Sequence, residues 1–245
     1  MDKMRLLARW EYKPVNIYRG YAGRTLYVNI SNFSFEERPV SEDMKEKFIG
    51  GRGFGLKLLW DAVKDTTKWN DPENEIVISG GPLCGITQYP GSGKCYTVFI
   101  SPLTEQTYDS NAGGYFGPLL KFSGWDALEI QGKADRDIVV FIDGDNNRVE
   151  IYESPFEEVN AVTVTEALHE YFAEDEEDKR NISVVSTGKG AENSYWGCLN
   201  MSFYDLRRKT PRLKQAGRGG GGTVFRDKKL AAIVVKKRGI GPSSN

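Results

Sequence analysis

The strongest constraint on the fold is a series of short runs rich in valine, isoleucine, threonine and aromatic residues, each closed by glycine, proline or asparagine. Such runs are typical of β-strands bounded by turns. The segment 143–147, Asp-Gly-Asp-Asn-Asn, joins two of them and is typical of a hairpin. We predict strands at 24–30, 75–79, 95–100, 127–130, 138–142, 148–152, 182–186 and 230–235.

Helical patterns are fewer and shorter than the strand patterns. Ser41 is a good N-cap for a helix that glycines at 50–53 interrupt, and helical spacing continues over 54–63. Further helices are predicted at 116–122 and 163–172, the second followed by a solvated acidic turn at 174–178. Because strands outnumber helices and are joined by hairpins as often as by helices, we predict an α+β fold with mixed or antiparallel sheets. The similar segments 77–81 and 184–188 suggest an internal repeat.

Bulk composition excludes several classes of protein. The 245 residues carry 33 basic and 34 acidic side chains, so no overall field recruits nucleic acid or an anionic membrane. Three cysteines without a Cys-x-x-Cys pair argue against a disulfide framework and favour a reducing compartment. The first nine residues carry charges where a signal peptide needs an apolar run, and no long apolar run follows. We predict a soluble, cytoplasmic protein that binds neither nucleic acid nor membrane.

Glycine is the one residue type in excess. The 27 glycines are about 11% of the chain, against roughly 7% in an average protein. Eight of them lie in two stretches, 109–117 and 215–222, the second beside Lys214 and containing Arg218. Glycine lets successive backbone N–H groups point into one concavity. Two such loops with cations suit a large anionic cofactor better than a small neutral substrate.

Three segments are similar to nucleotide- or RNA-binding motifs but do not match them. The run Gly91-Ser92-Gly93-Lys94 lacks the first glycine of a P-loop, replaced by Gln88, and its hydroxyl residue, replaced by Cys95. The glycines at 51, 53 and 55 have the wrong spacing for a dinucleotide fingerprint and follow a helix instead of a strand. The four glycines after Arg218 occur once, whereas RNA-binding Arg-Gly segments repeat.

Metal-ligating side chains are scarce. His169 is the single histidine, lies on an amphipathic helix and is predicted to pack in the core. With Cys84, Cys95 and Cys198 far apart in sequence, the chain alone closes neither a recognisable zinc site nor a four-cysteine iron–sulfur site.

Two interpretations of Asn111 stay open from the residues alone. Its amide could make a local Asx turn, or the following glycines could present N–H groups to an anion. Around the second glycine stretch, residues 207–209 and Arg212 add to Lys214 and Arg218 to form a basic patch that suits phosphate.

Seven segments, in this order, resemble the amino-terminal domain of the tungsten-containing aldehyde ferredoxin oxidoreductase family. They are 50–53, 81–85, 101–104, 111–117, 120–127, 130–134 and 216–220. The resemblance runs from about residue 22 to about residue 236. It divides the chain into an arm (1–21), a tungstopterin-binding domain (22–237) and a linker or tail cut short (238–245).

The resemblance implies two β-sheets related by pseudo-two-fold symmetry, with short flanking helices, on which a bis-pterin tungsten (or molybdenum) cofactor lies. It implies that a Mg²⁺ ion between the pterin phosphates is bound by the backbone carbonyls of Asn111 and Gln215, since Mg²⁺ prefers oxygen ligands. The implied pterin contacts are Lys94, Gly113, Lys214, Gly217 and Arg218.

This chain departs from the family pattern in two ways. Lys94 stands where the family has arginine, so a planar, bidentate contact becomes a single-point one, and Lys214 also replaces an arginine, a milder change for phosphate binding. The family's 4Fe-4S cluster ligands and catalytic residues follow this domain, so we expect them in further domains or in a partner subunit, and we expect this chain alone to be inactive.

The first functional hypothesis is the cofactor-binding portion of an enzyme that oxidises aldehydes to carboxylic acids and passes electrons to ferredoxin or another iron–sulfur acceptor. We also expect this protein to form an oligomer. The alternatives are a subunit of a tungsten benzoyl-CoA reductase-type enzyme, and a non-catalytic assembly module without cofactor.

Overall fold

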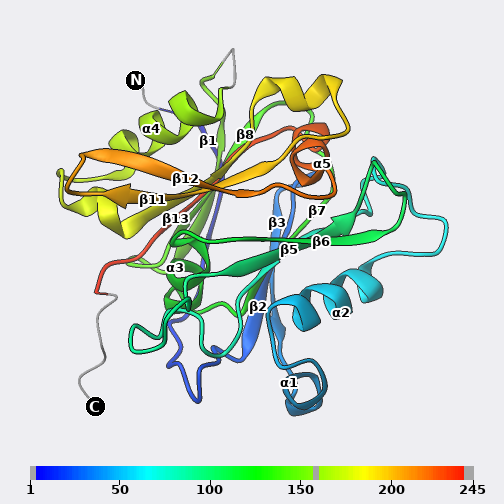
Figure 1. Cartoon of the computed structure of the whole chain (residues 1–245), viewed down its shortest axis with the longest axis horizontal. Helices are drawn as coiled ribbons and strands as arrows, with labels where there is room; N and C mark the ends of the chain where they lie inside the picture. The colour runs from blue at the N-terminus through cyan, green and yellow to red at the C-terminus, as the bar shows by residue number, and fades with distance from the viewer. Residues whose placement is uncertain (1–3, 157–159, 240–245) are drawn as a thin grey trace.

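The computed structural model describes residues 4–156 and 160–239, and two β-sheets dominate it (Figure 1). The seven-stranded sheet has the order β1 (Leu6–Glu11), β9 (Arg148–Glu153), β8 (Ile138–Asp143), β13 (Leu230–Lys236), β10 (Ile182–Ser186), β11 (Leu199–Asp205) and β12 (Thr210–Ala216). The six-stranded sheet has the order β3 (Ser34–Pro39), β2 (Arg24–Asn29), β7 (Ala127–Gln131), β4 (Ile76–Ser79), β5 (Cys95–Ile100) and β6 (Thr107–Ala112).

Short helices lie between and outside the sheets. They are α1 (Glu42–Phe48), α2 (Arg52–Ala62), α3 (Phe116–Phe122), α4 (Ala161–Phe172) and α5 (Gly221–Asp227), with 3-10 turns η1 (Asp178–Asn181) and η2 (Lys189–Asn193). Ser41 caps α1 as predicted, because its side chain accepts the Met44 N–H. Among the described helices, none has the length and apolar character that a membrane span requires. The fold class is therefore α+β with two mixed sheets, as predicted.

The two sheets are built from one repeated unit. Strands β2 to β7 occupy the same places in the six-stranded sheet as β8 to β13 occupy in the seven-stranded sheet. Each pair of neighbours also has the same direction, including the parallel pairs β2–β7 and β8–β13. Strand β1 is the one addition, beside β9. This confirms the internal repeat suggested by segments 77–81 and 184–188.

The register of the repeats also agrees residue by residue. Ser79 lies opposite Tyr96, and Tyr96 lies opposite Asn111. In the second repeat, Ser186 lies opposite Asn200, which lies opposite Gln215. Asn111 and Gln215 are therefore equivalent positions of the two halves.

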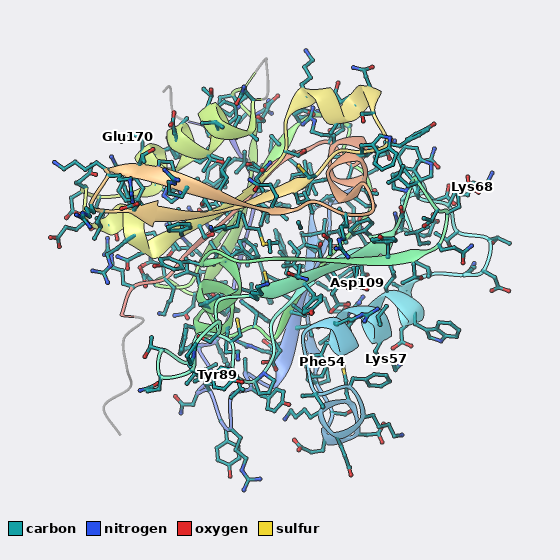
Figure 2. All side chains as sticks on the ribbon, viewed as in Figure 1. Phe54, Lys57, Lys68, Tyr89, Asp109 and Glu170 are labelled. Carbon is teal, nitrogen blue, oxygen red and sulfur yellow. The ribbon has the colours of Figure 1, made fainter. Side chains whose placement is uncertain are left out.

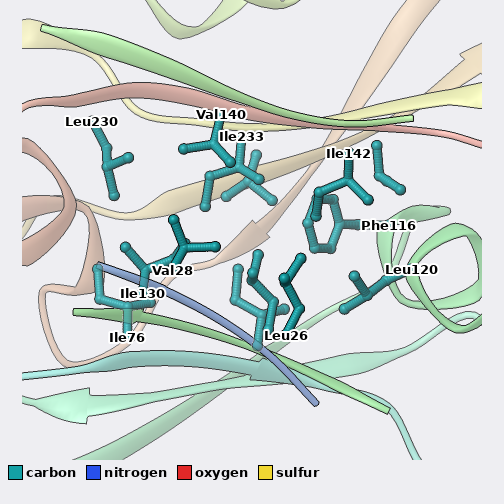
Figure 3. Close-up of a cluster of buried hydrophobic side chains, with 14 of the residues drawn as sticks. Leu26, Val28, Ile76, Phe116, Leu120, Ile130, Val140, Ile142, Leu230 and Ile233 are labelled. Atoms are coloured by element: carbon teal, nitrogen blue, oxygen red, sulfur yellow. The ribbon is translucent and has the colours of Figure 1, made fainter. Parts of the chain in front are cut away.

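The core has three parts arranged in layers. Between the sheets, aliphatic side chains from both sheets meet Phe116 and Leu120 of α3 (Figure 3). Helix α2 covers the outer face of the six-stranded sheet, where Leu59 packs on Val77 and Val98. Helix α4 covers the outer face of the seven-stranded sheet through a separate cluster. Figure 1 shows α4 and α2 on opposite sides of the two sheets.

The structure corrects several sequence predictions. Strands β1, β3, β6, β11 and β12 are not predicted by the pattern, and β1 lies within the segment expected to be an arm. Helix α5 begins at Gly221, within the second glycine stretch, where the sequence pattern predicts no helix. In the acidic turn, Asp178 is buried and pairs with Lys236 at 2.6 Å and Arg238 at 2.8 Å, so this residue is not solvated. Residues 1–3 of the arm and 240–245 of the tail lie outside the described residues.

Candidate functional site

The predicted site residues gather where edge strands of the two sheets meet. Strands β6 and β12 are each the last strand of a sheet, and they lie in contact with each other. Asp109, labelled in Figure 2, lies on β6 two residues before Asn111. A Cβ atom built on Gly113 would lie 3.7 Å from Cγ of Lys214 on β12. The Arg218 N–H donates to Ser110 Oγ at 3.1 Å, which ties the second glycine stretch to β6.

The backbone of β6 turns the Asn111 carbonyl toward this junction. The Ser110 carbonyl accepts a hydrogen bond from Thr97 Oγ1 at 2.9 Å and so faces β5. Successive carbonyls along a strand point to opposite sides, so the Asn111 carbonyl faces the edge that no described strand covers. The equivalent register gives Gln215 the same orientation on β12. Two such oxygen ligands fit a hard cation such as Mg²⁺.

The Asn111 side chain contacts Lys94 and makes no local turn. Its Oδ1 lies 3.4 Å from the Lys94 Nζ atom, and both residues are exposed. Because Asn111 is part of β6, the Asx-turn interpretation is wrong. The Gln215 amide is held differently, since its Nε2 donates to Asn200 Oδ1 at 3.2 Å.

Two glycines, Gly114 and Gly217, differ in what surrounds them. Gly114 has a φ of +98°, and a Cβ atom there would lie 3.1 Å from the Ser202 carbonyl, so packing itself requires glycine. Gly217 is exposed, and the nearest atom to a Cβ built there is Gln215 Cβ at 4.0 Å. Packing therefore does not demand glycine at 217. Open space in front of the backbone is what close approach of a ligand needs.

Positive charge at the junction comes from fewer residues than predicted. Lys214 and Arg218 are exposed, and Lys214 Nζ lies 5.8 Å from the centre of the Phe203 ring. Residues 207–209 form the tip of the β11–β12 hairpin, six residues from Gln215 and so roughly 20 Å away along the strand. Arg208 there pairs with Asp205 at 2.8 Å. The predicted basic patch is therefore divided, and its tip lies away from the junction.

Each glycine stretch is held by the other repeat. The Tyr115 N–H donates to the Ser202 carbonyl on β11 at 3.3 Å, and the Gly219 carbonyl accepts from Ser101 Oγ at 2.7 Å. Sequence reasoning missed Ser110, Ser202 and Ser101 as structural supports. Partners about a hundred residues apart leave no local signal in the sequence.

His169 packs in the core, as predicted. Its Nδ1 lies 3.1 Å from the Lys179 carbonyl and its Nε2 lies 2.9 Å from Ser202 Oγ. Burial lowers its pKa to about 4, so the ring is neutral at pH 7. The histidine supports the strand that holds Tyr115 and does not reach the junction.

Three comparisons place this architecture among known proteins. Residues 25–237 match the family described as aldehyde ferredoxin oxidoreductase, N-terminal domain. The tungsten-containing aldehyde ferredoxin oxidoreductase of Pyrococcus horikoshii is 35% identical over 217 residues, which cover 89% of this chain and 33% of that protein. The corresponding Pyrococcus abyssi protein is 36% identical over 218 residues, with the same coverage of 89% and 33%.

More distant relatives have other activities. The WOR-like subunit of the aliphatic sulfonate oxidoreductase of Pyrococcus furiosus is 32% identical over 91% of this chain and 35% of that protein. The active site complex BamBC of benzoyl coenzyme A reductase, solved with 1,5-dienoyl-CoA, matches with a TM-score of 0.75 and 27% identity. That match covers 89% of this chain and 31% of the solved one.

These proteins are oxidoreductases, and the chain spans about a third of the length of the curated relatives it matches. The match over 25–237 includes both repeats and the whole β6–β12 junction. The chain belongs to the aldehyde ferredoxin oxidoreductase family, in the part that corresponds to the N-terminal domain.

Proposed function

We propose that this chain is the cofactor-binding portion of a tungsten (or molybdenum) bis-pterin oxidoreductase. The assembled enzyme oxidises aldehydes to carboxylic acids and passes the electrons to an iron–sulfur acceptor such as ferredoxin. The observation that carries the proposal is the equivalence of Asn111 and Gln215 on two facing edge strands, with carbonyls turned to the junction. A ligand with two similar phosphate-bearing halves fits a site built twice.

Each junction residue has a separate role in this proposal. The carbonyls of Asn111 and Gln215 would hold a Mg²⁺ ion, whose charge would offset that of the pterin phosphates. Lys214 and Arg218 offset the phosphate charge, and Gly113 and Gly217 leave room for the ligand. When bound, the metal and its pterins supply the two-electron chemistry.

Lys94 has a role set by its contact with Asn111. Its ammonium lies 3.4 Å from Asn111 Oδ1, so it adds a positive charge near the residue whose carbonyl would face the ligand. A lysine makes a single-point contact, so it orients the pterin less rigidly than the family's arginine.

The remaining parts of the enzyme follow from the family. We propose that a 4Fe-4S cluster is carried by further domains or by a partner subunit, that the assembly is oligomeric and that it works in the cytoplasm. The similarity to relatives about three times as long supports this assembly.

The first test is elemental analysis of the native assembly purified through this polypeptide. The expected result is tungsten or molybdenum together with iron and magnesium. The absence of both tungsten and molybdenum from every native assembly would contradict the proposal and favour a cofactor-free assembly module.

The second test compares two exposed arginines. Arg218→Ala removes a charge-assisted phosphate contact and should weaken cofactor retention roughly tenfold to a hundredfold. Arg207→Ala, at the hairpin tip, is the matched control and should keep the metal content of the wild type. Equal metal content in both variants would remove Arg218 from the site.

The benzoyl-CoA reductase alternative has one observation in its favour, the 0.75 TM-score to the BamBC complex. Turnover assays with two substrates distinguish the two activities. Oxidation of short aldehydes by the native assembly, without turnover of an aromatic CoA thioester, supports the first function, and the reverse result supports the alternative.

A further inference from the structure

Two adjoining hollows lie beside the junction and share one arginine. The first has a volume of about 300 Å³ and runs between the loop at 85–93, which carries Tyr89 in Figure 2, and the first turns of α3. The second, of about 430 Å³, lies along β11. Tyr115 and Arg180 line both hollows.

The apolar wall of the hollows is fixed in place. Tyr115 is held by the hydrogen bond from its N–H to the Ser202 carbonyl, and its ring lies 5.5 Å from the Phe203 ring. Pro118 and Leu119 of α3 are buried and continue the wall. A preformed apolar surface with a few polar groups is typical of small-molecule sites.

Arg180 is the polar group with unused bonding capacity. Its neighbours are already paired: Asp178 binds Lys236 and Arg238, and Lys179 binds Glu170 and Glu176. Arg180 is exposed and makes no ion pair with any described residue. Its five N–H donors are therefore available to a ligand at the mouth of the hollows.

The surroundings of Arg180 favour a single carboxylate over a polyanion. A planar guanidinium matches a carboxylate with two parallel hydrogen bonds. On its other side, Arg180 adjoins a third hollow, in which Arg238 pairs with Asp178 and Glu174. Two more acidic residues of that hollow, Asp175 and Glu177, make no ion pair with any described residue. Their negative charges oppose a ligand with several charges but admit a compact anion whose apolar body lies on the opposite wall.

The position of the hollows links them to the junction. Gly93, which lines the first hollow, precedes Lys94, and Tyr115 follows the glycines at 113 and 114. We propose that Arg180 and the wall formed by Tyr115, Pro118 and Leu119 bind small organic monocarboxylates, the class that aldehyde oxidation produces. This inference rests on the proposed function for its physiological ligand, whereas the binding itself does not require the cofactor.

The test is the affinity of the purified protein for benzoate, measured by isothermal titration calorimetry. Benzyl alcohol supplies the aromatic body without charge, and inorganic phosphate supplies charge without the body. Benzoate should bind at least about tenfold more tightly than either, because only benzoate uses both the guanidinium and the wall. Equal affinity for phosphate, or no benzoate binding, would overturn the proposal.

Substitutions of residues that line the hollows test whether benzoate binds there. Arg180→Gln should lower the affinity for benzoate about tenfold or more, and Tyr115→Ala should also lower it. The affinity of Arg207→Gln for benzoate should equal that of the wild type. Circular dichroism checks that each variant is folded. Unchanged affinity in Arg180→Gln would overturn the proposal.

Metal content of the native assembly is measured in parallel, so the two proposals fail separately. Loss of benzoate binding with intact tungsten or molybdenum rejects the subsite alone. Intact benzoate binding without either metal rejects the cofactor proposal and leaves the subsite standing.

Discussion

The equivalent helix-to-sheet contact is built from different residues in the two repeats. In the first repeat, Gly55 of α2 lies directly on Val98 of β5, so closely that a Cβ atom there would overlap the valine side chain. Ser202 on β11 occupies the register position equivalent to Val98, and His169 of α4 meets it with a hydrogen bond of 2.9 Å. One contact is apolar and close, and the other is polar.

This difference shows which features of the repeat are under a common constraint. Strand order, direction and register agree between the halves, whereas the side chains at equivalent positions have changed in size and polarity. The proposed Mg²⁺ ligands are backbone carbonyls, so they depend on the shared register and not on side-chain identity. The site can therefore stay symmetric while the packing around it does not.

The largest expected effect concerns the sixth residue of α3 and of α5. Arg226 on α5 is buried and pairs with Asp137 at 2.9 Å and with Glu192 in η2. Lys121 on α3 is also buried but, among the described residues, donates only to the carbonyls of Gly81 and Pro82. Arg226→Met leaves two carboxylates without their partner, so we expect a loss of about 3–5 kcal/mol in the free energy of unfolding by urea.

Lys121→Met is the matched comparison for that experiment. Burial lowers the pKa of Lys121, which means that its charged form is already disfavoured in the fold. Removing the ammonium relieves this cost while two hydrogen bonds are lost, so the net change should be about 1 kcal/mol. Equal losses in the two variants would show that the anchors are equivalent despite their different partners.

The second prediction uses the polar contact of the second repeat. His169 has a pKa of about 4 in the fold, against 6.5 for an ordinary histidine, because it is buried. The folded state therefore binds fewer protons, and stability from this group is present above pH 6.5 and lost as the pH falls toward 4. The lowered pKa corresponds to about 3 kcal/mol.

Urea unfolding of the wild type and of His169→Gln between pH 7 and pH 4 measures this contribution. The wild type should lose about 3 kcal/mol relative to the variant over that range, because other titrating groups are common to both. The first repeat has Gly55 at this contact and contributes no such pH dependence. Parallel pH profiles for the two proteins would contradict the lowered pKa.

The sequence predicts every interior strand of the two sheets except β11 and fails at the edges. Strands such as β8 and β13 are buried along their whole length, so their apolar runs are unmistakable. All four edge strands, β1, β3, β6 and β12, are missed. Edge strands carry charged and polar residues that discourage pairing with other chains, so they lack an apolar run.

The same physical reason limits prediction of the candidate site. The glycines and cations draw attention to 109–117 and 215–222, but both Asn111 and Gln215 lie on edge strands that the pattern does not reveal. The contact between Ser110 and the Arg218 N–H spans 108 residues. Only the resemblance to a family indicates which carbonyls to examine, and the repeat explains why there are two.

The smallest effect tests the apolar contact of the first repeat. Gly55→Ala adds a methyl group where Val98 Cγ2 already lies, in a buried part of the α2 interface. Overpacking destabilises the fold by about 1–3 kcal/mol, and replacing glycine by alanine inside a helix stabilises it by about 1 kcal/mol. We therefore expect a net loss of about 1 kcal/mol in urea unfolding.

Val98→Ala completes a double-mutant cycle on this contact. Alone it should be destabilising, because it leaves a cavity under α2. In the double variant the methyl group added by Gly55→Ala occupies part of that space, so the combined loss should be smaller than the sum by about 1 kcal/mol. Simple additivity would show that α2 moves away from β5 to accept the methyl. The close approach of α2 to β5 would then be a consequence of having glycine at 55. The spacing between helix and sheet would depend on the side chains at this contact in the first repeat as it does in the second.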